Sequence, residues 1–133
     1  MKERCEKALK AEGYLPKRDE DDDIIVKVQG VIFIVIAQDG DEQSAPFIRV
    51  WCPKFWALED AAEFAKAHYV SNKLNTEYRV AKINIIDKDT HGFAEFFIDP
   101  NDAKFDAIFL RMFDILLAMR MEFATEMRQE QFI

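Results

Sequence analysis

The sequence predicts an α+β fold, a single domain of residues 1–133 in which helices pack on an antiparallel sheet of about five strands. Half of the residues are apolar and twelve are Phe, so a chain of this length can build a core. Only four Gly and four Pro are present, which favours long regular elements. Short β-branched runs and longer helical patterns follow one another in the order αβββαββα.

The N-terminal half predicts one helix followed by three strands. The expected helix is 3–12, and the expected strands are 24–28, 31–37 and 46–52. Gly13 ends the helix, and the acidic run 19–23 predicts a solvated linker. Residues 29–30, Gln-Gly, fit a two-residue turn, and Pro53 is expected to end the third strand.

The C-terminal half predicts two helices on either side of a β-hairpin. The expected elements are a helix at 59–74, strands at 79–86 and 93–98, and a last helix at 102–128. The hairpin turn is expected at 87–92, which makes His91 a solvated turn residue. Asp99 and Pro100 provide an N-cap and a first helical residue ahead of the last helix.

The last helix has almost no polar side. At about 100° per residue, two neighbouring apolar stripes run along it. The first stripe is Phe105, Phe109, Met112, Leu116, Met119 and Phe123. The second stripe is Leu110, Phe113, Leu117, Met121 and Ala124. A surface helix has one stripe against its own core, so the second stripe predicts contact with a partner, and a homodimer is the natural candidate.

Two expected strands, 31–37 and 93–98, are apolar on both sides. An antiparallel sheet with one solvated face would alternate apolar and polar residues. We therefore expect both faces of the middle of the sheet to be covered. The second cover can be part of the same chain, a second subunit or a client segment.

Charge and hydropathy disfavour several classes of partner. The net charge of −7 and the pI of about 4.9 disfavour binding to nucleic acid or to anionic lipid. The longest apolar run, 31–37, is far shorter than the ~20 residues of a membrane-spanning helix. The first thirteen residues are charged and lack the apolar core of a signal peptide. A cytoplasmic protein is expected, in which Cys5 and Cys52 are reduced thiols.

No set of residues predicts catalysis, a metal or a cofactor. His68 shares a helix face with Phe64 and Asn72, where it is either part of a ligand pocket or a hydrogen-bonded structural side chain. No Ser, Cys or carboxylate lies on that face at a supporting spacing. Asn72 and Asn75 either bind a ligand or tie the helix end to the next strand. The acidic run at 19–23 lacks the Gly and distal Glu of a calcium loop, and Asp39, Asp41 and Glu42 do not match that pattern either.

The third expected strand carries an aromatic and cationic cluster. Phe47, Arg49 and Trp51 alternate along one side of it. Trp and Arg are common anchors at protein interfaces, although a core position is the usual place of an aromatic residue. We therefore include Phe47 and Trp51 with the second stripe as candidate interface residues.

Two segments of the chain carry a resemblance to a known family. They are residues 67–98, AHYVSNKLNTEYRVAKINIIDKDTHGFAEFFI, and residues 9–14, LKAEGY. Both resemble the YbjN-like family of bacterial sensory transduction regulators. The element order with its long apolar C-terminal helix is similar to the type III secretion chaperone-like fold. This resemblance implies a small acidic cytoplasmic protein, often dimeric, without catalytic activity. The dimeric secretion chaperones wrap an extended client segment around the sheet and helices.

Together these observations predict a non-enzymatic chaperone-like or adaptor protein that binds a segment of another protein as a homodimer. The net charge of −7 favours a basic client. The alternative is a small-ligand-binding sensory module, with a pocket between the helix at 59–74 and the sheet that contains His68 and Asn72.

Overall fold

The computed structural model describes residues 1–130, and it confirms the α+β fold class. Within this range there are three helices, α1 (Lys2–Ala11), α2 (Ala61–Glu77) and α3 (Phe105–Met127). There are six strands, β1 (Lys17–Arg18), β2 (Ile24–Val28), β3 (Val31–Gln38), β4 (Phe47–Ala57), β5 (Ala81–Ile86) and β6 (Asp89–Phe97). All strand pairs are antiparallel, in the spatial order β1-β2-β3-β4-β6-β5.

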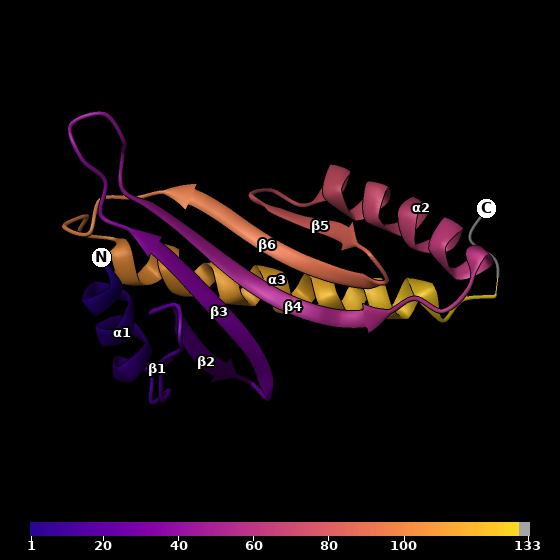
Figure 1. Ribbon diagram of the computed structural model, residues 1–133, viewed down its shortest axis with the longest axis horizontal. Helices are drawn as coiled ribbons and strands as arrows, with labels where there is room; N and C mark the ends of the chain where they lie inside the picture. The colour runs from indigo at the N-terminus through magenta and orange to yellow at the C-terminus, as the bar shows by residue number, and fades with distance from the viewer. Residues whose placement is uncertain (131–133) are drawn as a thin grey trace.

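The molecule has two layers, a twisted sheet and a layer of helices on one side of it (Figure 1). Helix α3 runs behind the long strands and packs against β4, β5 and β6. Helices α1 and α2 pack against opposite ends of α3. Arg4 of α1 pairs with Asp106 near the start of α3. Lys66 of α2 donates hydrogen bonds to the carbonyl oxygens of Met127 and Gln129, at and just beyond the end of α3.

The core lies between α3 and the sheet, and the first apolar stripe forms its helical side. All six residues of this stripe are buried. They face buried sheet residues, among which Phe33, Val35, Ile48 and Val50 are fully enclosed. Alternation along β3 and β4 places these residues on one face of the sheet.

The second apolar stripe is divided between core and surface. Phe113 is 2% exposed and its ring meets that of Phe33 at 5.0 Å, so it lies in the core. Phe113 follows Phe109 by four residues, about 40° around the helix, which keeps it close to the first stripe. Leu110 and Leu117 are half-buried, whereas Met121 is 67% exposed.

Two elements of the N-terminal half differ from the sequence prediction. The expected linker at 19–23 is a tight turn that joins β2 to the two-residue strand β1, which the sequence analysis missed. The Asp19 carboxylate accepts the backbone N–H groups of Asp21 and Asp23 and so shapes this turn. Strand β4 continues past Pro53 to Ala57 through a bulge between Cys52 and Trp56.

The C-terminal hairpin and helix also begin at different residues than expected. The hairpin turn is short, because β6 starts at Asp89, and His91 is therefore a buried strand residue and not a solvated turn residue. Helix α3 starts at Phe105, with Lys104 as its N-cap residue. Asp99 accepts hydrogen bonds from the N–H groups of Asn101 and Asp102, which holds 99–102 as a turn ahead of the helix.

None of the helices within residues 1–130 is both long enough and apolar enough to cross a membrane.

Candidate functional site

The face of the sheet opposite the helices is not covered by any part of the chain between residues 1 and 130 (Figure 1). Alternate residues of a strand point to opposite faces. Phe33 and Val35 of β3 are fully buried under the helices, whereas Ile32 on the other face is 51% exposed. Ile34 and Ile36 are only half-buried. Below, this uncovered side is called the open face.

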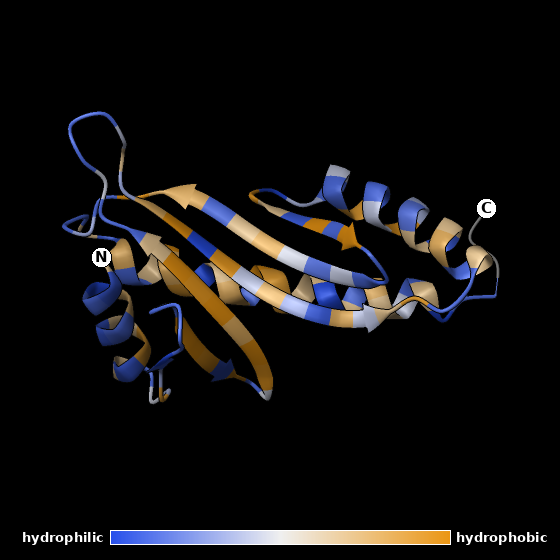
Figure 2. Cartoon of the chain, in the orientation of Figure 1, coloured by the Kyte–Doolittle hydropathy of each residue, from blue (hydrophilic) through white to orange (hydrophobic). Residues whose placement is uncertain are grey.

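A single cross-strand row runs over the open face from one edge of the sheet to the other. It consists of directly paired residues on all six strands. From edge to edge the row is Lys17, Ile25, Ile34, Trp51, Phe93 and Lys82. Neighbouring strands lie about 4.8 Å apart, so the row is about 24 Å long. Its centre is apolar and aromatic, and each end carries a lysine. In Figure 2, β3 is orange along most of its length, whereas β4 and β6 alternate between orange and blue or white.

Aromatic pairs occupy the middle and one end of the open face. Trp51 and Phe93 stack with their ring centroids 5.9 Å apart and an interplanar angle of 14°. Phe47 and Phe97 lie directly opposite each other on β4 and β6, with ring centroids at 5.4 Å. Phe97 is 73% exposed, which is unusual for a phenylalanine and makes it the most accessible aromatic side chain of this face.

His91 lies on the open face beside Trp51 and Phe93, with its ring centroid 5.7 Å from that of Trp51 and 6.2 Å from that of Phe93. The indole N–H of Trp51 donates to Nδ1 of His91 at 3.0 Å, and the backbone N–H of Lys54 approaches the same atom at 3.4 Å. Because Nδ1 accepts, the ring proton lies on Nε2 and the imidazole is neutral. Burial lowers the pKa of His91; the Asp89 carboxylate opposes this shift and the Lys54 ammonium group adds to it. The ring is thus a fixed acceptor that orients Trp51.

The Glu95 carboxylate forms ion pairs with Arg49 and Lys82 at the edge of the aromatic cluster. Nε and Nη2 of Arg49 donate to one carboxylate oxygen at 2.8 and 2.6 Å. Lys82 Nζ lies 2.6 Å from the other oxygen. The hydrogen bond from Lys82, reinforced by Arg49, lowers the pKa of Glu95. The guanidinium of Arg49 also lies 5.5 Å from the centre of the Phe93 ring, which adds a cation–π contact.

The residues predicted as an interface belong to two separate surfaces. Phe47 and Trp51 lie on the open face. Leu110, Leu117 and Met121 lie on α3, in the helix layer on the other side of the core. Phe113 lies within the core itself and presents no surface.

His68 and Asn72 do meet in one place, a shallow hollow of about 370 Å³ between α2 and β5. Both side chains are exposed, which does not fit the second interpretation of His68, a hydrogen-bonded structural side chain. Ser71 also lines this hollow, and its buried hydroxyl has no hydrogen-bond partner among the described residues.

Asn75 ties α2 to the sheet, as one of the two interpretations of the sequence predicted. Its Nδ2 donates to the carbonyl oxygen of Ile83 at 3.0 Å, and its Oδ1 accepts the N–H of Ile83 at 2.7 Å. Ile83 lies on the outermost strand β5, so the side-chain amide of Asn75 replaces a neighbouring strand at this residue. Asn72 makes no such bond to β5.

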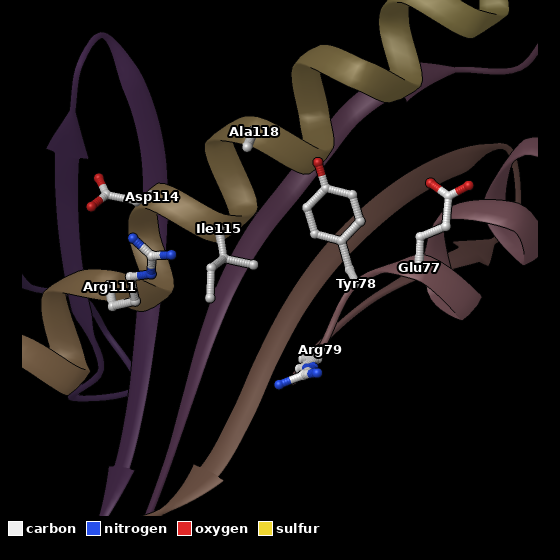
Figure 3. Close-up of a pocket in the computed structure, with 7 residues that line it drawn as sticks. All are labelled: Glu77, Tyr78, Arg79, Arg111, Asp114, Ile115 and Ala118. Carbon is white, nitrogen blue, oxygen red and sulfur yellow. The ribbon is translucent and has the colours of Figure 1, made fainter.

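A larger cavity of about 590 Å³ lies between α3 and the connection from α2 to β5 (Figure 3). Figure 3 shows Arg111 and Ile115 of α3 on one side and Tyr78 and Arg79 on the other. The hydroxyl of Tyr78 donates to Glu122 at 2.7 Å, and burial together with this carboxylate raises the pKa of Tyr78 to about 12. The tyrosine is thus a structural link between α3 and the end of α2 and stays protonated at neutral pH.

Two other groups of reactive side chains have structural explanations. The carboxylates of Asp19, Asp21 and Asp23 lie within 4.8 Å of one another, but Asp19 already uses an oxygen to hold the turn. Cys5 and Cys52 are both buried and free. Burial raises the pKa of Cys5 to about 12 and that of Cys52 to about 11, so neither thiol forms a reactive thiolate near neutral pH.

The role of His91 is not evident from the sequence, because residues 87–92 were expected to form a turn, whereas β6 starts at Asp89. One signal was present: His91, Phe93, Glu95 and Phe97 follow one another at the two-residue period of a strand.

No protein-family model matches this chain, and no curated protein gives a significant sequence match. The interpretation of the open face therefore depends on its own geometry and chemistry.

Proposed function

We propose that this protein is a non-enzymatic chaperone-like or adaptor protein that binds a segment of another protein on its open face. The observation that carries the proposal is an uncovered sheet face with apolar and aromatic side chains at its centre and charged ones around it. Contiguous apolar patches rimmed by polar residues mark interaction sites. Phe97, Phe47 and Trp51 are the anchors, because large aromatic side chains contribute most to binding energy at interfaces.

Rigidity of the anchors supports this role. Trp51 is held by its hydrogen bond to His91 and by stacking on Phe93. Side chains that are already ordered before binding lose less conformational entropy when the partner arrives. The open face is thus prepared to accept a segment without rearrangement of the sheet.

We further propose that the protein acts as a cytoplasmic homodimer, through the outer side of α3 and not through the open face. Leu110 and Leu117 are half-buried and Met121 is 67% exposed on that side of α3. This arrangement leaves the open face available for the client. It also agrees with the dimeric character that the YbjN-like resemblance implies.

The test is retention of a client from native cells by the immobilised protein. Phe47→Ser with Phe97→Ser should abolish retention while the melting temperature changes little, because Phe97 is exposed. Met121→Ser, which removes an exposed apolar side chain from α3, is the matched control and should retain the client. Equal retention by the open-face variant would show that the client binds elsewhere.

A second candidate function is binding of a small polar ligand in the hollow that contains His68 and Asn72. The buried, unpaired hydroxyl of Ser71 favours it, since buried polar groups normally have a hydrogen-bond partner. A thermal-shift screen of metabolites tests this idea. Stabilisation that is lost in His68→Ala and Asn72→Ala, but kept in the Phe47→Ser/Phe97→Ser variant, would favour the ligand-binding function.

A further inference from the structure

We infer that the segment bound by the open face is acidic, with an apolar or aromatic centre flanked on both sides by Asp or Glu. The inference rests on the proposed function, because it assumes that the open face binds a peptide segment. It reverses the basic client that the net charge of the whole chain predicts.

The open face has the opposite charge to the rest of the molecule. Among the described residues, the strand registers place four cationic and two anionic side chains on this face, and Lys54 in the bulge of β4 adds a fifth cation next to His91. The cations are Lys17, Lys27, Arg49, Lys54 and Lys82, and the anions are Asp89 and Glu95. The acidic turn at 19–23 lies outside this count, beyond the edge strand β1. The chain as a whole carries −7, so its excess of carboxylates lies on the helices and loops. A partner that docks on the sheet therefore meets a positive local potential within an acidic protein.

The cations of the open face are available to a partner. Glu95 is shared by Arg49 and Lys82, so one carboxylate balances two positive charges. Lys17, Lys27 and Lys54 are exposed and form no ion pair with any residue between 1 and 130. A carboxylate on a bound segment would give each of these ammonium groups a partner at the rim of the interface.

The cross-strand row sets the spacing of charges that fits. Lys17 and Lys82 stand at its two ends, with Ile25, Ile34, Trp51 and Phe93 between them. An extended peptide rises about 3.4 Å per residue, so the row of about 24 Å corresponds to roughly seven residues. The complementary segment thus has acidic residues roughly seven positions apart, with apolar side chains between them.

The other occupants fit this surface less well. A second copy docked face to face would bring the lysine-rich rims of two open faces together. A single-stranded nucleic acid needs free aromatic faces on which bases stack. Here Trp51 and Phe93 stack on each other, and much of the remaining apolar surface is Ile25, Ile32, Ile34 and Ile36, which offer no stacking surface.

The experiment is selection of a random peptide display library on the immobilised full chain. We expect enrichment of peptides with an aromatic or aliphatic centre and carboxylates on both sides. The charge-reversal variant Lys17→Glu/Lys27→Glu/Lys54→Glu changes only exposed side chains and leaves Lys82 in place, so it should select peptides that have lost the carboxylates facing the reversed positions. The Phe47→Ser/Phe97→Ser variant removes the anchors and should select neither group.

The outcomes separate the two proposals. Peptides that depend on Phe97 but are neutral or basic would overturn the acidic segment and leave the proposed function in place. Absence of any peptide that depends on open-face residues would overturn both. Display on wild-type protein, charge-reversal variant and anchor variant therefore gives a different pattern for each case.

Affinity measurements complete the test. A selected acidic peptide should bind the charge-reversal variant at least about tenfold more weakly, a loss of about 1.4 kcal/mol, and its on-rate should fall with added salt. A short single-stranded polyuridylate is the nucleic-acid probe. If polyuridylate bound more tightly than the peptide and this binding required Phe97, the occupant would be nucleic acid and the inference would be wrong. Sedimentation of a dimer that dissociates in the Phe47→Ser/Phe97→Ser variant would instead assign the open face to a second copy.

Discussion

The two faces of the sheet are built from the same strands and differ in what covers them. On the helix side, Phe33, Val35, Ile48 and Val50 are completely enclosed. On the open side, their immediate neighbours Ile32 and Ile34 stay exposed or half-buried. Since both sets are apolar, the difference comes from the position of α3 and not from the chemistry of the strands. Apolar residues on the helix side stabilise the fold, and those on the open side form the surface on which we propose that a partner binds.

The substitution expected to have the greatest effect on folding replaces a core aromatic residue of α3. Phe113→Glu places a carboxylate beside the rings of Phe33 and Phe109, where burial of an unpaired charge costs several kcal/mol. We expect loss of the cooperative thermal transition measured by circular dichroism. Met121→Glu, on the exposed side of the same helix, should fold normally and, if this side is the dimer contact, sediment as a monomer. A folded, monomeric Phe113→Glu protein would contradict the core position of Phe113.

The next effect compares two phenylalanines on opposite faces. Phe33→Ala removes a fully buried ring and should lower the free energy of unfolding by about 3–5 kcal/mol. Phe97→Ala removes a ring that is 73% exposed and pairs mainly with Phe47, so the loss should be no more than about 1 kcal/mol. Urea unfolding of both variants measures the difference. Similar losses would mean that the open face is buried in solution, for example by a second subunit.

The smallest effect tests the neutral state of His91. Its folded pKa lies below the usual value of about 6.5, so the unfolded chain takes up a proton that the folded chain does not. This contribution to stability is complete above about pH 6.5 and is lost as the pH falls through the folded pKa, with a slope of at most about 1.4 kcal/mol per pH unit. His91→Gln should flatten the fall in stability as the pH is lowered below about 6.5. His68→Gln alters the exposed histidine and should keep the wild-type dependence; an identical dependence in His91→Gln would refute the role of His91.

Much of the fold follows from local patterns in the sequence. The prediction for β2 matches its bounds, and that for β3 differs by one residue, because β-branched runs bounded by turns are strong signals. Strand β1 was not predicted, because a strand of two residues is too short to show the two-residue hydrophobic period of a strand. The predicted end of β4, at residue 52, was wrong. Pro53 lies beside a bulge, where the missing N–H of proline interrupts no regular strand pairing, so the strand continues past it.

The site was predictable only in part. Alternation placed Phe47 and Trp51 together, and the open face brings them together with Phe93 and Phe97. Which of two apolar faces the helices cover depends on contacts between distant segments, so Ile34 and Val35 looked equivalent in the sequence. The same dependence put Phe113 in the core although its stripe suggested an interface.

The tie between Asn75 and Ile83 limits how this protein can assemble. A chain with a bare apolar sheet face is at risk of joining other copies strand by strand, and such growth starts at a free sheet edge. At one edge the Asn75 amide already occupies the hydrogen-bonding groups of Ile83, and at the other β1 offers only two residues. An added strand would therefore find free pairing groups mainly at residues 26–28 of β2, which β1 does not pair. A client bound on the open face, as we propose, would add a single layer there and give a complex of fixed stoichiometry.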